Sequence, residues 1–94
     1  MKSVLVRHEK VTDELGNTVE IKLWKVPWTP DKPKGYKYSL VYIVEGERVI
    51  GYDNSEQKGD HRHYRGQEKP YTFTTLRQLA DDFLADVEEY KRNS

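Results

Sequence analysis

The chain has 94 residues, 35% of them hydrophobic and 34% charged, which is long enough for one small folded domain over residues 1–94 and too short for a second lobe. Its 16 basic and 16 acidic residues cancel, so net charge gives no reason to expect a nucleic-acid partner. The absence of cysteine excludes disulfides and thiol chemistry, and no apolar run is long enough for a membrane span or a signal peptide, which predicts a cytoplasmic protein.

The first half of the chain predicts antiparallel hairpins. Residues 19–23 alternate apolar and charged side chains, as in a half-buried strand, and DELGN at 13–17 supplies the turn before them. After a basic, proline-rich loop, YKYSLVYIVE at 36–45 is the strongest strand signal, with apolar residues on both faces. RVIGYD at 48–53 then returns antiparallel to it.

The second half predicts one weak strand and one helix. DHRHYR at 60–65 alternates like a strand, although Tyr64 is its only apolar residue. Thr75 and Gln78 form a capping-box pattern, and apolar residues then recur every three or four positions, while acidic residues such as Asp86 are expected to face solvent. The predicted fold is therefore α+β: a small antiparallel sheet of about four to five strands built from hairpins, packed against one C-terminal amphipathic helix.

The segment KGDHRHYRGQEKP at 58–70 carries two of the three histidines. Alternation along a strand sorts its side chains onto two sides, with His61, His63 and Arg65 on one and Asp60, Arg62 and Tyr64 on the other. Two histidines on one side lie roughly 6.5 to 7 Å apart by the strand rise. One imidazole could then remove a proton from a ribose 2′-hydroxyl while the other protonates the leaving 5′-oxygen, because histidine titrates near neutral pH.

Two other interpretations fit the same segment. Both imidazoles could bind one metal ion, with His8, Asp53 or Asp60 completing the shell and a bound water activated for hydrolysis. Alternating histidine and arginine on an exposed edge strand could also be only a solvated surface. The pattern His-x-His does not choose among these by itself, but the surrounding lysines, arginines and glycines favour binding of an anion such as phosphate.

Residues outside this segment offer weaker candidates. Trp24, Trp28 and Tyr36 flank the basic proline-rich loop, and they could stack on unpaired bases or simply pack in the core. His8 has apolar neighbours on its side of the first strand, which predicts a partly buried, hydrogen-bonded histidine and not a third catalytic one. Asp53 ends a strand before the loop that leads to the histidines, so it could orient an imidazole.

Four features together resemble the TumE family of toxins from bacterial toxin–antitoxin systems. They are GYDN at 51–54, the short polar loop after it, KGDHRHY at 58–64 and the helix LRQLADDFLADVEEY at 76–90. The resemblance covers about residues 48–90 and is most specific at KGDHRHY. It implies a small cytoplasmic bacterial toxin with a cognate antitoxin, commonly a helix-turn-helix protein. It carries over no established catalytic mechanism.

The residues and the resemblance together predict a toxin that acts on RNA as a metal-independent ribonuclease without a cofactor. The catalytic candidates are His61 and His63 for proton transfer, with Asp60 and Tyr64 orienting them, and the substrate-binding candidates are Lys58, Arg62 and Arg65. One alternative is a non-catalytic module that binds nucleic acid or protein through residues 58–69. A second is a metal-dependent hydrolase or nucleotide-modifying enzyme. The sequence leaves self-association open.

Overall fold

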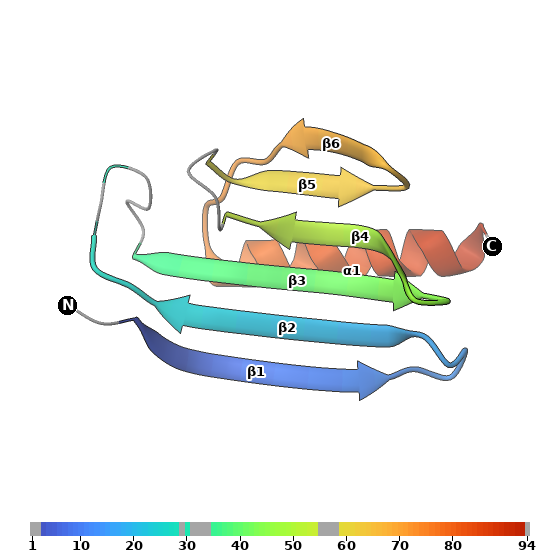
Figure 1. Ribbon diagram of the computed structural model, residues 1–94. Helices are drawn as coiled ribbons and strands as arrows, with labels where there is room; N and C mark the ends of the chain where they lie inside the picture. The colour runs from blue at the N-terminus through green and yellow to red at the C-terminus, as the bar shows by residue number, and fades with distance from the viewer. Residues whose placement is uncertain (1–2, 29, 31–34, 55–58, 94) are drawn as a thin grey trace.

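The computed structural model describes residues 3–28, 30, 35–54 and 59–93, which form an antiparallel sheet and a helix (Figure 1). In chain order the elements are β1 (Val4–Thr12), β2 (Thr18–Lys25), β3 (Tyr36–Val44), β4 (Glu47–Asp53), β5 (His61–Tyr64), β6 (Gln67–Pro70) and α1 (Leu76–Arg92). Each strand pairs with the next one in the chain, so the spatial order is β1-β2-β3-β4-β5-β6. The predicted α+β class is confirmed, and the described sheet has six strands where four to five were expected.

The additional strand, β6, follows β5 through a two-residue turn. Arg65 at φ 50° and Gly66 at φ 85° form this turn, and Tyr64 pairs with Gln67 across it. Two consecutive residues with positive φ are typical of the tight turns that match the twist of a hairpin. All four residues of β6 are exposed, so its sequence shows no apolar alternation by which it could have been predicted.

The predicted turn at 13–17 is confirmed. Asp13 Oδ1 accepts hydrogen bonds from the backbone N–H groups of Leu15 at 2.9 Å and Asn17 at 3.0 Å, while Gly16 adopts φ 82°. The aspartate side chain therefore holds the turn, as is usual for this residue type.

The partly buried position predicted for His8 is wrong. Every residue of β1 is exposed, because β1 is the edge strand and pairs only with β2. The predicted hydrogen bonding of His8 is present, since its Nε2 lies 3.0 Å from Glu20 Oε2.

Helix α1 covers one face of the sheet and leaves the other uncovered. Thr75 is its N-cap, as predicted, and its hydroxyl accepts the N–H of Gln78 at 3.0 Å. The helix packs on alternate residues of β3 and β4, in a core that includes Tyr38, Leu40, Tyr42, Ile50, Tyr52, Leu79, Phe83 and Val87. Figure 1 looks onto the uncovered side, with α1 behind β3 and β4. We call this uncovered side the open face. In the described part of the chain, no helix is long and apolar enough to cross a membrane.

One acidic residue of α1 faces the sheet, contrary to the expectation that the acidic residues of this helix face solvent. Asp86 is 8% exposed, and it follows Phe83 by three residues, which places both on the buried side of the helix. Arg62 of β5 donates from Nε and Nη2 to the two carboxylate oxygens at 2.7 and 2.8 Å, and the Tyr52 hydroxyl donates to the same carboxylate. This pairing attaches β5 to α1 and so determines which side of β5 is left on the open face.

Candidate functional site

Strands β4 and β5 bring ionisable side chains together on the open face. Asp53 pairs with His61 and Gly51 pairs with His63, and residues paired across strands point to the same side of a sheet. The intervening Arg62 is held by α1, so the two histidines point away from the helix. They therefore share one side of β5, as strand alternation predicts.

His61 is buried, and both of its ring nitrogens face oxygen atoms. Nε2 lies 2.9 Å from Asp53 Oδ1, and Nδ1 lies 3.2 Å from the carbonyl oxygen of Gly59. Both partners are hydrogen-bond acceptors, so a ring nitrogen donates to its partner only when it carries the proton. Glu68 Oε1 lies 4.0 Å from the same Nε2 and adds a second negative charge. The site therefore holds the His61 ring in place between oxygen atoms.

His63 lies beside His61 in different surroundings. The two ring centroids are 5.3 Å apart, with their planes at 74°. Burial lowers the pKa of His63 below its ordinary value and the positive charge of Arg48 lowers it further, while Glu68, whose Oε2 is 3.5 Å from His63 Nε2, acts in the opposite direction. The net effect favours neutral His63 at neutral pH, when its ring has a nitrogen that can accept a proton.

A cationic side chain lies across the same part of the open face. A Cβ added at Gly51 would meet Arg48 Cδ at 3.1 Å and Nε at 3.4 Å, so the arginine side chain occupies the space above this glycine. Its Nη1 stands 4.0 Å from Asp53 Oδ2. Arg48 thus brings a positive charge next to the carboxylate that holds His61.

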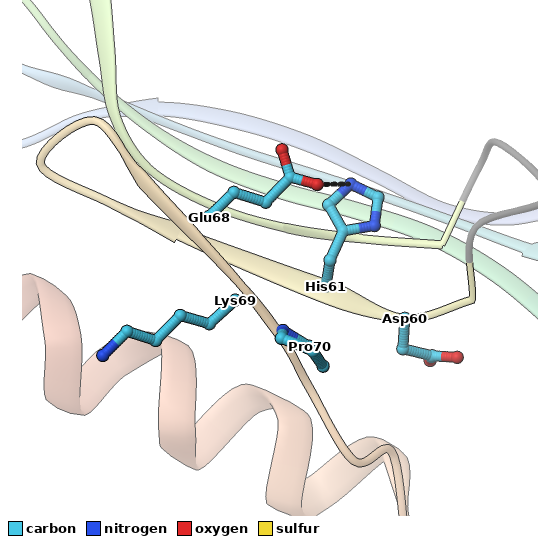
Figure 2. A pocket seen from close by; sticks show the side chains of 5 residues that line it. All are labelled: Asp60, His61, Glu68, Lys69 and Pro70. Carbon is cyan, nitrogen blue, oxygen red and sulfur yellow. Dashed lines mark ion pairs between the residues drawn. The ribbon is translucent and has the colours of Figure 1, made fainter.

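The histidine side of β5 borders a hollow of about 240 Å³ lined by Asp60, His61, Glu68, Lys69 and Pro70. Figure 2 shows His61 and Glu68 extending to the side of β5 and β6 that faces away from α1, whereas Lys69 extends to the helix side. Alternation along β6 separates Glu68 from Lys69 in this way. The part of the hollow on the open face therefore combines an imidazole with a carboxylate.

A sequence model of the family described as toxin TumE matches residues 2–91 of the chain. The chain belongs to the TumE toxin family. The matched range contains the whole described sheet and nearly all of α1. No curated protein and no solved structure matches the chain. Membership in the TumE family gives the protein a toxin role and implies an antitoxin partner.

In this TumE-family protein, the side chains of two predicted orienting residues, Asp60 and Tyr64, form no hydrogen bond with His61 or His63 within the described residues. Asp60 accepts a hydrogen bond from the Tyr38 hydroxyl at 2.6 Å, and Tyr38 belongs to the core. Tyr64 is directed to the helix side, and within the described residues its buried hydroxyl has no hydrogen-bond partner. Lys58 lies outside the residues that the structure describes. The carboxylate that contacts His61 is instead Asp53, the other orienting candidate.

The two arginines predicted to bind substrate lie on the helix side of the sheet. Arg62 is held by Asp86. Arg65 is predicted on the same side as His63, but it belongs to the β5–β6 turn, where strand alternation ends. Its guanidinium carbon stands 4.4 Å from the centroid of the Tyr90 ring. The prediction that Arg65 lies on the histidine side of the sheet is therefore wrong, because its φ of 50° ends the strand at this residue.

Sequence reasoning did not single out Arg48 and Glu68 for this site. Arg48 reaches it from the far end of β4, and Glu68 reaches it through β6, a strand that the pattern did not reveal. The available signal was Gly51, because a glycine inside a strand often marks a place where another group approaches the backbone closely.

The same group of side chains could hold a metal ion. One ligand atom from each of Asp53, His61 and His63 lies within 4.8 Å of the others. Two imidazoles and a carboxylate are donors suited to zinc and related ions. The other two candidates for this shell are engaged elsewhere, since His8 contacts Glu20 and Asp60 contacts Tyr38.

Proposed function

We propose that this TumE-family protein is the toxin of a toxin–antitoxin pair and cleaves cytoplasmic RNA by metal-independent acid/base transesterification. The observation that carries the proposal is a pair of imidazoles with contrasting surroundings, 5.3 Å apart on the open face and close to an arginine. Such a reaction needs a base, an acid and a cation, and these three groups supply one of each.

His63 is the general base of the proposed reaction. Its lowered pKa favours the neutral ring at neutral pH, as a base requires. The ring takes the proton of a ribose 2′-hydroxyl, whose oxygen attacks the adjacent phosphorus. A bond forms between phosphorus and O2′, and the phosphate becomes a five-coordinate phosphorane.

His61 is the general acid. In its imidazolium form it gives the Nε2 proton to the 5′-oxygen while the bond between phosphorus and O5′ breaks. The products are a 2′,3′-cyclic phosphate and a free 5′-hydroxyl, and the proton gained by His63 returns to His61 through solvent. In the free protein Asp53 accepts from this same Nε2, so the leaving oxygen replaces that contact when substrate binds.

Arg48 stabilises the negative charge of the phosphorane. Its side chain lies over Gly51, whose strand partner is His63, and Arg48 is close enough to lower the pKa of that histidine. A fixed cation at the developing charge is among the largest contributions to catalysis of this type. Arg65 stacks on Tyr90 on the helix side and is poorly placed for this role.

The test is cleavage of a labelled RNA in the presence of a chelator, together with growth arrest when the protein is expressed without its antitoxin. His61→Ala and His63→Ala should each lower the cleavage rate by about 10²- to 10⁴-fold and abolish growth arrest. His8→Ala is the matched control, because His8 also contacts a carboxylate but lies at the far edge of the sheet. Unchanged cleavage by both site variants would overturn the proposal, as would growth arrest with RNA left intact.

The shared ligand geometry of Asp53, His61 and His63 favours a metal-dependent hydrolase as the second candidate. In that case the chelator should abolish cleavage, and stoichiometric zinc or manganese should restore it. Asp53→Asn separates the two mechanisms further. It should weaken metal binding strongly, whereas in the acid/base reaction it removes only a group that orients His61.

A further inference from the structure

Beside the histidine site, the open face continues across β3 and β2. Ser39 of β3 pairs with Asp53 on one side and with Lys22 on the other. Because Asp53 also pairs with His61, these four residues form one row across the sheet, on the same side as the two histidines. The row runs from the histidine site on β4 and β5 through Ser39 of β3 to Lys22 of β2.

Trp24 and Lys37 pair with each other two residues further along the same two strands. Lys37 Nζ stands 5.1 Å from the centroid of the Trp24 ring, in a cation–π contact. Trp24 is only partly buried, and it is outside the group of side chains that form the core or pack against it. Core packing therefore does not account for this tryptophan.

The position of Trp24 relative to the histidine site suits an extended polynucleotide. Two strand spacings and two residues of strand rise separate it from Asp53, which corresponds to roughly 12 Å between backbones. A short run of single-stranded RNA can span this distance while one phosphate lies at the histidines. Lys22 and Lys37 flank the path with positive charge.

We infer that single-stranded RNA lies across the open face, with one base stacked on Trp24 and the neighbouring phosphates contacted by Lys37 and Lys22. An incoming base displaces the Lys37 ammonium from the ring, and the freed cation neutralises a phosphate. An aromatic platform bordered by lysines is the usual means of binding single strands, because every base has a face that can stack. The location of the reacting phosphate at His61 and His63 rests on the proposed function.

The chemistry of this surface favours a single strand over a duplex or a protein. A base in a duplex is already stacked on both sides, so it cannot also stack on Trp24. An antitoxin covering the open face would bury the Trp24 ring against apolar groups, but the ring is bordered by an ammonium group.

Binding is measured in a background that cannot cleave, with His61→Ala and His63→Ala together. The chain has two tryptophans, so Trp28→Phe in this background leaves Trp24 as the only indole fluorophore. Titration with a twelve-nucleotide single-stranded RNA should quench its fluorescence, whereas the matched Trp24→Phe variant, which retains Trp28, should show little quenching. Trp24→Ala should weaken binding about tenfold and Trp24→Phe less, because phenylalanine still stacks.

Two single variants, Lys37→Ala and Lys25→Ala, test the contribution of lysine charge to the proposed RNA binding. Lys25 pairs with Tyr36, so it lies next to Trp24 but on the opposite side of the sheet. Lys37→Ala should weaken binding and reduce its salt dependence, while Lys25→Ala should leave both unchanged. The same oligonucleotide annealed into a duplex should bind at least tenfold more weakly than the single strand.

Equal affinities of the Trp24→Ala variant and its parent would overturn the inference, as would tighter binding of the duplex. Loss of antitoxin binding in Trp24→Ala with RNA affinity unchanged would assign this surface to the protein partner instead. Because binding is measured without cleavage, the proposed chemistry can fail while this surface is confirmed. In that case RNA binds through Trp24 but the protein with both histidines intact does not cut it.

Discussion

Replacing Arg62 by alanine should lower the free energy of unfolding by about 3 kcal/mol, although Arg62 stands between the two proposed catalytic histidines. Its guanidinium donates twice to Asp86 and once, at 3.0 Å, to the Tyr52 hydroxyl. The substitution leaves the Asp86 carboxylate buried without its cation. The loss therefore arises from the fold and not from the chemistry on the open face.

The magnitude follows from the burial of the two partners. Removing one member of a buried ion pair destabilises a protein by about 3 to 5 kcal/mol, because the remaining charge is uncompensated. The Asp86 side chain is 11% exposed and that of Arg62 is 30% exposed, so partial solvation places the effect at the lower end of this range. The Tyr52 hydroxyl still donates to Asp86 after the change, which limits the loss further.

Urea unfolding followed by far-ultraviolet circular dichroism measures the effect. With a slope of about 1.5 kcal/mol per molar urea, the midpoint of Arg62→Ala should fall by about 2 M. Arg7→Ala is the control, because Arg7 forms an equally short ion pair with Glu9 on the exposed edge strand and should leave the midpoint unchanged. The double change Arg62→Met with Asp86→Leu should recover at least half of the loss. A midpoint shift for Arg62→Ala no larger than that of Arg7→Ala would refute the reasoning.

Three further predictions concern the site and the helix. Gly51→Ala should slow RNA cleavage at least tenfold by displacing Arg48, with stability unchanged within about 0.5 kcal/mol, as kinetics and urea unfolding would show. Cleavage should persist below pH 6.5, because the lowered pKa of His63 keeps this base unprotonated to lower pH. Arg48→Ala removes a positive charge that lowers this pKa, so the loss of activity on the acidic side of the rate profile should move to higher pH. Among the described residues, the charged or titratable groups that act on His63 are Arg48, Asp53, His61 and Glu68. Thr75→Ala should cost about 1 kcal/mol and lower the melting temperature by about 4 to 8 °C, measured by calorimetry, through loss of the helix cap.

The parts of the fold that the sequence predicts are those with a local physical signal. Aromatic and β-branched residues mark β3, in which Tyr38, Leu40 and Tyr42 are buried under α1. Thr75 marks the start of the helix because its hydroxyl accepts the N–H of Gln78 there. Strand β6 has no such signal, since it pairs through its backbone while its side chains are exposed. The role of Asp86 is also invisible in the sequence, because only the tertiary partner Arg62 makes a buried carboxylate favourable.

In the candidate site, too, the features with a local sequence signal are predicted and those that depend on tertiary contacts are not. Strand alternation suffices to place His61 and His63 together, because that property is local to β5. Alternation fails for Arg65, where positive φ ends the strand, and it cannot find Arg48, whose approach depends on the side chain missing at Gly51. Contacts between strands decide these positions, and a single stretch of sequence does not contain them.

The two sides of β5 also determine how variants without toxicity should be interpreted. A change at Arg62 should reduce toxicity by destabilising the fold, whereas a change at His63 should reduce it by stopping the proposed chemistry, so growth alone does not distinguish them. An antitoxin recognises a folded surface, which the His63 variant retains and a strongly destabilised Arg62 variant loses in part. Co-purification with the antitoxin therefore separates the two classes. Only residues whose loss abolishes toxicity while leaving this complex intact belong to the candidate site.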